Sequence, residues 1–337
     1  MTEAQKIGQL FMVGNSASAV EGSTLTAITS YHVGNVMLRG RSTAGVAATA
    51  RVSAALAGRV SRASTASARL FIATDEEGGA VRVLRGAGFD AIPSALVQGS
   101  WSTASLRASA TRWGAQLRAA GVNLDLAPVL DTVPSAALAR LNPPIGAFNR
   151  EYGYSPSVVS AHGLAFLDGL SASGVDVAVK HFPGLGRVSN NTDNSAHVTD
   201  NITVRGDGYL APFQDAVDAG AAFVMMSTAY YSRIDPSHPA AFSPTIVTGM
   251  VRGDLGFGGV IISDDLGNAR QVSAWSPGSR AVQFIAAGGD MVLTVNTSLL
   301  PAMVKAVTAK AIDPAFARLI DAAVLRILTA KAMRGLI

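Results

Sequence analysis

Side chains of the kinds that do chemistry stand directly after short apolar runs of this sequence. Asp75 follows one run, Lys180 and His181 end a second, and Asp264 and Asp265 follow a third. Carboxylates and histidine are common general acids, bases and nucleophiles, and a lysine at such a position can form a Schiff base. These positions therefore predict a site for acid–base or nucleophilic chemistry.

Other apolar runs end in the same way. Asp131 lies just beyond one run, Ser227 and Thr228 follow another, and Asn296 follows the last. A single polar strand end means little because turns are polar, but six at equivalent places form a stronger pattern. If the runs are parallel strands of a barrel, all six ends face one mouth, which is where barrel enzymes place their active sites.

The apolar runs themselves predict the scaffold that positions these groups. They are Leu10–Val13, Val36–Leu38, Leu70–Ala73, Val122–Ala127, Val175–Val179, Phe223–Met226, Val260–Ile262 and Met291–Leu293. Runs that are short, nearly continuous and bounded by glycine or polar turns are typical of strands buried on both faces.

Longer alanine- and leucine-rich stretches with helical spacing lie between or after the runs. The clearest are Ala104–Ala120, Ser157–Leu170, Tyr209–Ala219 and Pro314–Met333. Strand–helix alternation repeated eight times predicts an α/β fold, a (β/α)8 barrel of the TIM type. A doubly wound parallel sheet is the alternative, because periodicity does not by itself show that a sheet closes.

The composition favours one barrel domain over residues 1–337. Hydrophobic residues make up 49% of the chain and charged residues 15%, which excludes disorder as its main state. No apolar stretch reaches the roughly 18 residues of a membrane helix, so we expect no membrane span. No shift in composition marks a second domain, and we expect the protein to be a monomer.

Charge and cysteine content exclude several classes of function. The net charge of +4 is small for this length and no run of five basic residues occurs, so we expect no nucleic-acid partner. The absence of cysteine excludes disulfides, thiolate catalysis and cysteine-based zinc sites. The segment Met1–Lys6 lacks the basic and then apolar pattern of a signal peptide. We expect a cytoplasmic protein, or one of the cell envelope or secreted if a leader has been removed.

Several segments resemble glycoside hydrolase family 3. Ala178–Gly186 is similar to the family's Lys-His-Phe-Pro-Gly signature, and Val260–Leu266 resembles its nucleophile strand. Asp75–Gly79 resembles the family's Asp-Gln-Glu-Gly-Gly turn, Asn123–Asp131 a further strand end, and Asn142–Gly153 the arginine loop. The likeness covers nearly the whole chain. It is strongest to the single-domain β-N-acetylhexosaminidases, in the Gly-Leu-Gly-Arg-Val form of actinobacterial members.

This resemblance implies a glycosidase that releases terminal β-linked N-acetylglucosamine, with muropeptides from peptidoglycan as its substrates. It implies retention of the anomeric configuration through a covalent glycosyl-enzyme on Asp264, and a separate proton donor across the glycosidic bond. The neighbouring Asp265 is expected to cap the next helix instead. We expect neither a metal nor a cofactor, because the sequence has no ligand spacing or phosphate-binding glycine loop for one.

The resemblance places the proton donor on the loop that follows the Lys-His-Phe-Pro-Gly signature. In the subgroup, an Asp-Ser/Thr-His segment supplies a histidine held by an aspartate, and Asp193 fits that aspartate. The nearest histidine is His197, four residues on, in a loop slightly longer than usual. His197 is the expected acid because a neighbouring carboxylate raises an imidazole pKa. Alternatively, His197 is an exposed loop residue, and Asp193 or a water that it positions protonates the leaving group.

Four residues match sugar-binding positions of the family: Asp75, Arg150, Lys180 and His181. Charged groups make the stronger hydrogen bonds, and a carboxylate or an arginine can bind two adjacent hydroxyls at once. Lys180 could instead be held in an ion pair with a barrel carboxylate, and His181 could be a core histidine.

The sequence departs from the family pattern at three places, and other functions stay open. Ala80, Ser227–Thr228 and Gly267–Asn268 each replace a common family segment. The alternatives are a β-glucosidase of the same family, a sugar-binding barrel with impaired catalysis, and an aldolase that uses Lys180 as a Schiff base. Phosphate could also replace water as the acceptor.

Overall fold

All eight apolar runs form parallel strands of one sheet, as the sequence predicts. The computed structural model describes residues 1–337. Its barrel strands are β1 (Phe11–Ser16), β2 (Asn35–Arg39), β3 (Phe71–Thr74), β6 (Leu124–Asp125), β7 (Asp176–Phe182), β9 (Phe223–Met226), β12 (Val260–Ser263) and β13 (Val292–Thr294). Their hydrogen-bonded order is β12-β9-β7-β6-β3-β2-β1-β13, and a parallel bridge between Ile262 and Met291 joins the two ends. The sheet therefore closes into a barrel, and the doubly wound alternative is wrong.

Burial on both faces explains why these runs are apolar throughout. Every residue of β7, β9 and β12 is buried. Alternate side chains of a barrel strand point into the barrel or outward against the surrounding helices, so neither face tolerates many polar residues. Polar residues are therefore concentrated where the strands end.

Twelve α-helices accompany the strands. They are α1 (Glu3–Gln9), α2 (Gly22–Ser30), α3 (Val46–Ala57), α4 (Arg62–Thr65), α5 (Ala95–Gln98), α6 (Thr103–Ala119), α7 (Ala136–Ala139), α8 (Pro156–Ala172), α9 (Ala211–Asp218), α10 (Pro277–Ala286), α11 (Leu300–Lys310) and α12 (Pro314–Met333). Short 3-10 segments are η1 (Gly146–Phe148), η2 (Gly208–Leu210), η3 (Ala240–Phe242), η5 (Arg270–Val272) and η6 (Thr297–Leu299), and η4 (Thr245–Asp254) is π-helical. The four predicted helices are confirmed as α6, α8, α9 preceded by η2, and α12.

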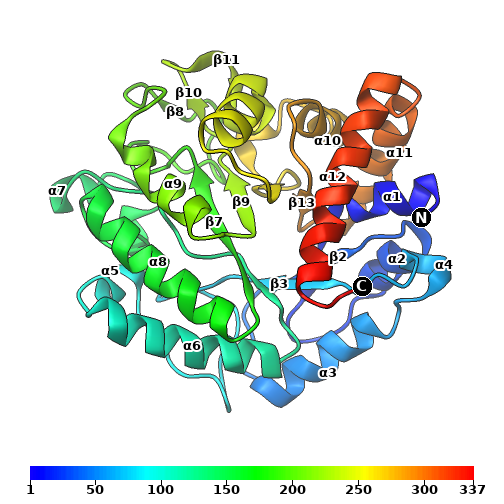
Figure 1. Cartoon of the computed structure of the whole chain (residues 1–337), viewed down its shortest axis with the longest axis horizontal. Coiled ribbons are helices and arrows are strands. Elements are labelled where there is room, and N and C mark those ends of the chain that lie inside the picture. The colour runs from blue at the N-terminus through cyan, green and yellow to red at the C-terminus, as the bar shows by residue number, and fades with distance from the viewer.

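Two small sheets belong to segments that follow barrel strands. The hairpin β4 (Glu76–Gly78) and β5 (Val81–Arg82) follows β3, and a three-stranded sheet joins β8 (Thr199–Asp200), β10 (Tyr230–Tyr231) and β11 (Asp235–Pro239). In Figure 1, β8, β10 and β11 lie together away from the barrel, near the top of the view. These additions build up the end of the barrel where the polar strand ends collect.

The hydrophobic core is a continuous cluster of 90 buried residues that spans the barrel and the helices around it. Figure 1 shows both chain termini on the same side of the molecule, beside α1, α2 and α4. None of the helices combines the length and the apolarity that crossing a membrane requires.

Candidate active site

A cavity of about 510 Å³ opens at the carboxyl ends of the barrel strands. Its walls are formed by Met37, Asp75, Val81, Leu126, Pro144, Arg150, Lys180, His181, Leu185, Asn191, Thr192, Asp193, Asn194, Met225, Asp264, Asp265, Asn268, Ala269, Leu293 and Val295. Of the seven site residues expected from the sequence, the structure brings together all except His197. The cavity size lies within the range of roughly 300–1,000 Å³ that is common for small-molecule sites.

Lys180 is buried in the cavity wall between two carboxylates. Its Nζ lies 2.7 Å from Oδ1 of Asp75 and 2.7 Å from Oε1 of Glu77. Burial alone would lower the pKa of Lys180, but the two carboxylates outweigh it and raise this pKa above its ordinary value. A lysine that stays protonated is a poor nucleophile, which argues against a Schiff-base aldolase.

Glu77 connects this lysine to the arginine of the site. Arg150 donates two hydrogen bonds to it, from Nε to Oε2 at 2.8 Å and from Nη2 to Oε1 at 2.7 Å. Burial opposes the ionisation of Glu77, but Arg150 and Lys180 outweigh burial and lower its pKa to about 2. Glu77 is thus an anion that fixes both cations. The sequence reasoning did not single out Glu77, although it stands within the Asp75–Gly79 motif.

The turn after Glu77 explains why this motif carries two glycines. Gly78 and Gly79 have φ values of +108° and +56°, which side chains rarely adopt. A Cβ on Gly78 would also lie 2.1 Å from the carbonyl oxygen of Pro93. The buried amide of Gln98 donates to the Glu77 carbonyl at 2.9 Å and holds the turn from behind. The hairpin therefore holds the buried Glu77 beside Lys180 and Arg150 in one orientation.

His181 is oriented by a carboxylate behind it. Its Nδ1 lies 2.7 Å from Oδ2 of the fully buried Asp131, whose Oδ1 accepts the backbone N–H groups of His181 and Leu185 at 3.1 and 2.7 Å. With Nδ1 as the donor, Nε2 faces Arg150, with 3.5 Å between Nε2 and the arginine Nη2. Asp131 therefore acts through His181. The sequence indicated that Asp131 follows a strand, but not that it orients His181.

Asp264 is the first residue after β12. Its backbone N–H donates to the carbonyl of Met226 at 3.1 Å, which ties the residue to β9. Its Oδ1 accepts the N–H of Asp265 at 2.8 Å, and its Oδ2 has no hydrogen-bond partner in the protein. Asp265 accepts the N–H groups of Gly267 and Asn268 at 2.8 and 3.3 Å and so caps the turn after β12, rather than the next helix as the sequence predicts, since η5 begins only at Arg270.

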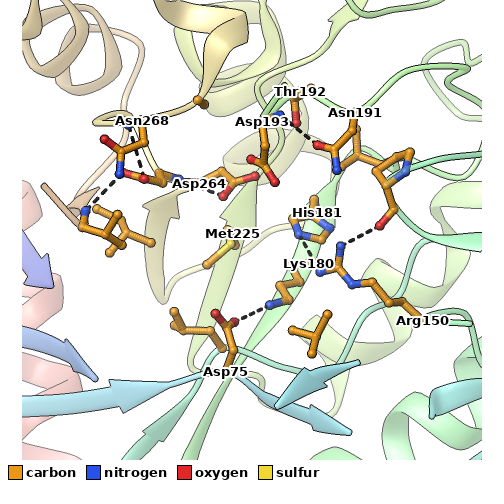
Figure 2. Close-up of a pocket in the computed structure, with 18 of the residues that line it drawn as sticks. Asp75, Arg150, Lys180, His181, Asn191, Thr192, Asp193, Met225, Asp264 and Asn268 are labelled. Carbon is orange, nitrogen blue, oxygen red and sulfur yellow. Dashed lines mark hydrogen bonds and ion pairs between the residues drawn. The ribbon is translucent and has the colours of Figure 1, made fainter. Parts of the chain in front are cut away.

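Asp193 projects from the loop that follows β7 into the mouth of the cavity. Figure 2 shows its carboxylate and that of Asp264 turned toward each other. Desolvation and then the charge on Asp264 raise the pKa of Asp193 to about 6, although His181 and Arg150 oppose the shift. No protein group donates a hydrogen bond to this carboxyl. A carboxyl group that keeps its proton to about pH 6 is suited to donate it.

The structure does not bring His197 to the cavity. Its side chain is exposed and borders a separate shallow depression beside Thr199 and Tyr230. Its backbone has a left-handed φ of +59°, the next residue is buried, and β8 then pairs with β10 away from the barrel. These contacts direct His197 outward. This corrects the expectation that His197 stands beside the reacting bond.

Not every polar strand end reaches the cavity. Ser227 and Thr228 are buried behind the wall, where the Ser227 hydroxyl accepts the N–H of Ala229 at 3.0 Å. Asn296 caps η6 through the N–H of Ser298 at 3.1 Å. These residues are structural, as isolated polar strand ends often are.

The assembled site suits a neutral ligand rich in hydroxyl groups. Asp75, Lys180 and Arg150 supply charged donors and acceptors on one side, together with the ring of His181, and two facing carboxylates stand on the other. No group of three or more His, Cys, Asp or Glu side chains converges as metal ligands do. The arrangement can bind hydroxyls by charge-assisted hydrogen bonds and can combine one carboxylate with one carboxylic acid in catalysis.

Comparisons with known proteins agree with this chemistry. A profile of the Glycosyl hydrolase family 3 N terminal domain matches residues 2–330. The β-N-acetylhexosaminidase from Beutenbergia cavernae DSM 12333 is 53% identical in sequence, and its crystal structure superposes with a TM-score of 0.98 over 98% of this chain and 99% of that chain. A family 3 β-N-acetylglucosaminidase from Paenibacillus sp. str. FPU-7 is 31% identical, with a TM-score of 0.90 over 100% of this chain and 63% of that chain. A β-hexosaminidase of Xanthomonas campestris pv. campestris (strain B100) is 34% identical over 255 residues, which are 72% of this chain and 73% of the relative. The chain thus belongs to glycosyl hydrolase family 3, and it is a glycosidase.

Proposed function

We propose that this glycosidase removes terminal β-linked N-acetylglucosamine with retention of configuration, through a covalent intermediate on Asp264. The observation that carries the proposal is the pair of facing carboxylates, one on a rigid strand end and one on a loop. They stand at the mouth of a cavity whose other wall binds hydroxyls. A retaining glycosidase requires such a pair on opposite sides of the scissile bond.

In the first step, Asp264 is the nucleophile. Its free oxygen, Oδ2, attacks the anomeric carbon, and a bond forms between that oxygen and C1 while the bond from C1 to the leaving oxygen breaks. Asp193 donates its proton to the leaving oxygen, so the aglycone departs as a neutral alcohol. The raised pKa of Asp193 keeps this proton available up to about pH 6.

In the second step, the two carboxylates exchange duties. Asp193, now ionised, accepts a proton from a water molecule, whose oxygen attacks C1 from the side that the aglycone left. The bond between C1 and Asp264 breaks, and its electron pair returns to the carboxylate. Two inversions give net retention, and both side chains recover their starting protonation states.

The remaining polar residues bind the sugar and hold it at the reacting distance. Asp75 accepts hydrogen bonds from hydroxyls, while Arg150, Lys180 and His181 bind hydroxyls remote from C1. Lys180 and Arg150 are fixed by Glu77, and His181 is fixed by Asp131, so little side-chain entropy is lost when substrate binds. Such preorganisation favours attack, because catalysis is sensitive to small displacements of the reacting groups.

The preference for N-acetylglucosamine and for muropeptides is the finer part of the proposal. It is supported by the 53% identical β-N-acetylhexosaminidase and by the apolar side chains that share the cavity wall with the charged ones. Comparing kcat/KM for 4-nitrophenyl β-N-acetylglucosaminide and for the β-glucoside tests the first preference. A higher value for the glucoside would indicate a β-glucosidase instead. Comparing a disaccharide from peptidoglycan with N,N′-diacetylchitobiose tests the second.

Trapping of the intermediate tests the mechanism. A 5-fluoro N-acetylglucosaminyl fluoride keeps the acetamido group and slows hydrolysis of a glycosyl-enzyme. We expect the intact protein to gain the mass of one sugar and the label to map to Asp264. Retention without a label would point to participation of the substrate's own acetamido group, and inversion would exclude both routes. Product formed in phosphate buffer identifies the acceptor, since phosphorolysis would give a sugar phosphate.

A further inference from the structure

Gln271 makes a two-point contact with the end of the loop that carries Asp193. Its Oε1 accepts the backbone N–H of Val198 at 2.9 Å, and its Nε2 donates to the carbonyl of Val198 at 3.2 Å. Gln271 and Val198 are both buried, at 3% and 2% exposure. The N–H of Val198 has no other partner in the protein, whereas its carbonyl also accepts the N–H of Tyr230.

Gln271 lies in the short helix η5, whose backbone also binds the beginning of this loop. In η5, the N–H of Arg270 donates to the carbonyl of Asp193 at 3.1 Å, and the N–H of Gln271 donates to the carbonyl of Thr192 at 3.0 Å. Four hydrogen bonds therefore join the segment from Thr192 to Val198 to η5. Because η5 begins six residues after Asp264 on the same connection, the loop that carries the acid is attached to the segment that follows the nucleophile.

The segment that follows Asp264 is held in turn by Arg280. The guanidinium of this buried residue donates from Nη1 to the carbonyls of Leu266 and Gly267 at 2.8 and 2.9 Å, and from Nε to that of Trp275 at 2.8 Å. The segment to which the loop 192–198 is attached is thus fixed to α10, the helix that contains Arg280. The carboxyl of Asp193 makes no hydrogen bond with the protein, so its position depends on the backbone attachments alone.

We propose that Gln271 is a positioning residue for proton donation: it holds the loop 192–198 on η5 and so fixes Asp193 opposite Asp264. The inference rests on the proposed function, because it assigns to Gln271 the alignment of the acid described there. Substitution would leave a buried N–H of Val198 unpaired, and the loop would have to rearrange to satisfy it. Since β8 is still held by its pairing with β10, the expected change is confined to the acid loop.

The test uses leaving groups that differ in their need for a proton. The variants are Gln271→Leu and Gln271→Glu, and the second keeps an acceptor for the Val198 N–H but loses the donor at neutral pH. The control is Gln5→Leu, because Gln5 is also buried and its Nε2 donates to the carbonyls of Arg62 and Ala63, in α1 before the first barrel strand. Each protein is assayed with N,N′-diacetylchitobiose and with 2,4-dinitrophenyl β-N-acetylglucosaminide, whose leaving group needs no proton.

We expect Gln271→Leu to lower kcat on the disaccharide by roughly 10- to 100-fold, the scale of a misplaced catalytic group, with little change in KM. The two substrates are compared by kcat/KM, because this quantity reports the first step alone. The kcat/KM of the dinitrophenyl glycoside should fall less than about threefold, because its first step bypasses general acid catalysis. Gln271→Glu should lie between wild type and Gln271→Leu. In Gln271→Leu, the pH above which activity falls should be lower than in wild type. A displaced Asp193 is farther from Asp264 and better solvated, and both changes lower its pKa.

Three results would overturn the proposal. These are equal losses on both substrates, losses matched by Gln5→Leu, or unchanged kcat in a folded Gln271→Leu protein. If Gln271→Leu does not fold, the same comparison of losses on the two substrates is made with Gln271→Glu. The Asp193→Asn variant separates this inference from the proposed function. If Asp193→Asn loses more activity on the disaccharide than on the dinitrophenyl glycoside but the Gln271 variants do not, only the role of Gln271 is wrong. If Asp193→Asn shows no such difference, Asp193 is not the acid.

Discussion

The two walls of the cavity are built in opposite ways. On one wall, opposite charges interlock: Glu77 lies between Arg150 and Lys180, and its pKa falls to about 2. On the other, two like charges face each other, and the pKa of Asp193 rises to about 6. The first wall is anchored on β3, β4 and β7, whereas the carboxyl of Asp193 has no hydrogen-bond partner in the protein and stands on a loop that four hydrogen bonds attach to η5.

The difference separates binding from catalysis. Cations and anions in alternation stabilise one another, so Glu77, Lys180 and Arg150 hold each other in place and stay ionised across the physiological pH range. Two carboxylates side by side disfavour full ionisation, so one of them keeps a proton that it can donate. The fold therefore tolerates an unfavourable pair of charges where the reaction needs one acid and one anion.

Replacing the proposed nucleophile should give the largest effect. We expect Asp264→Ala to lower kcat on an aryl N-acetylglucosaminide by on the order of 10⁴-fold or more, because the proposed mechanism forms the glycosyl-enzyme on this carboxylate alone. Azide, which is small enough to occupy the vacated space, should partly restore turnover and give the α-glycosyl azide, identified by NMR. A β-azide product would contradict direct attack by Asp264.

Replacing the acid should give a smaller and substrate-dependent effect. We expect Asp193→Asn to lower kcat on substrates with poor leaving groups by roughly 10²- to 10⁴-fold, while dinitrophenyl substrates lose little in the first step. In wild type, kcat/KM should fall as the pH rises above about 6, because deprotonation of Asp193 removes the donor. In Asp193→Asn this basic limb should be absent. A limb that persists in the variant would assign the titration to another group.

Disrupting the binding wall should affect binding and stability more than chemistry. We expect Glu77→Gln to raise KM at least about tenfold and to destabilise the fold by about 3 kcal/mol, because the buried Lys180 and the half-buried Arg150 lose their shared anion. The control is Asp254→Asn, since its ion pair with Arg205 is exposed and should contribute little to stability. Urea unfolding and steady-state kinetics measure both effects.

The same variant has a pH signature whose sign follows from the lowered pKa of Glu77. A depressed carboxyl pKa contributes stability that is complete above the ordinary value of 4.5 and is lost as the pH falls toward about 2. Wild type should therefore lose more stability than Glu77→Gln between pH 5 and pH 2, as measured by unfolding at each pH. Parallel curves would mean that folding does not lower the pKa of Glu77.

The smallest effect is expected at His197. Because its side chain is exposed and lies outside the cavity, His197→Ala should change kcat less than about twofold and leave the pH profile unchanged. A loss of kcat comparable with that of Asp193→Asn would show that the loop moves during turnover. His197 would then act in the cavity together with Asp193.

The strands and the long helices could be predicted from the sequence because their signals are local. A run such as Phe223–Met226 is apolar on both faces, and Pro314–Met333 repeats its apolar residues at helical spacing. The residues at strand ends, such as Lys180 and Asp264, were predicted with the strands, since a strand end fixes its side chain to one edge of the sheet. Loop residues carry no such constraint, and the expectation for His197 failed for that reason.

By itself, the sequence determined the eight strands, their order and the strand-borne half of the site, because runs buried on both faces admit few other arrangements. The tertiary structure decided that the sheet closes into a barrel, through the pairing of its two ends. Only the tertiary structure decided which residues act together: that Glu77 joins Arg150 to Lys180, that Asp131 orients His181, and that Gln271 holds the loop of Asp193. These contacts link positions far apart in the chain, and their energies depend on burial and distance, which no local pattern of residues encodes.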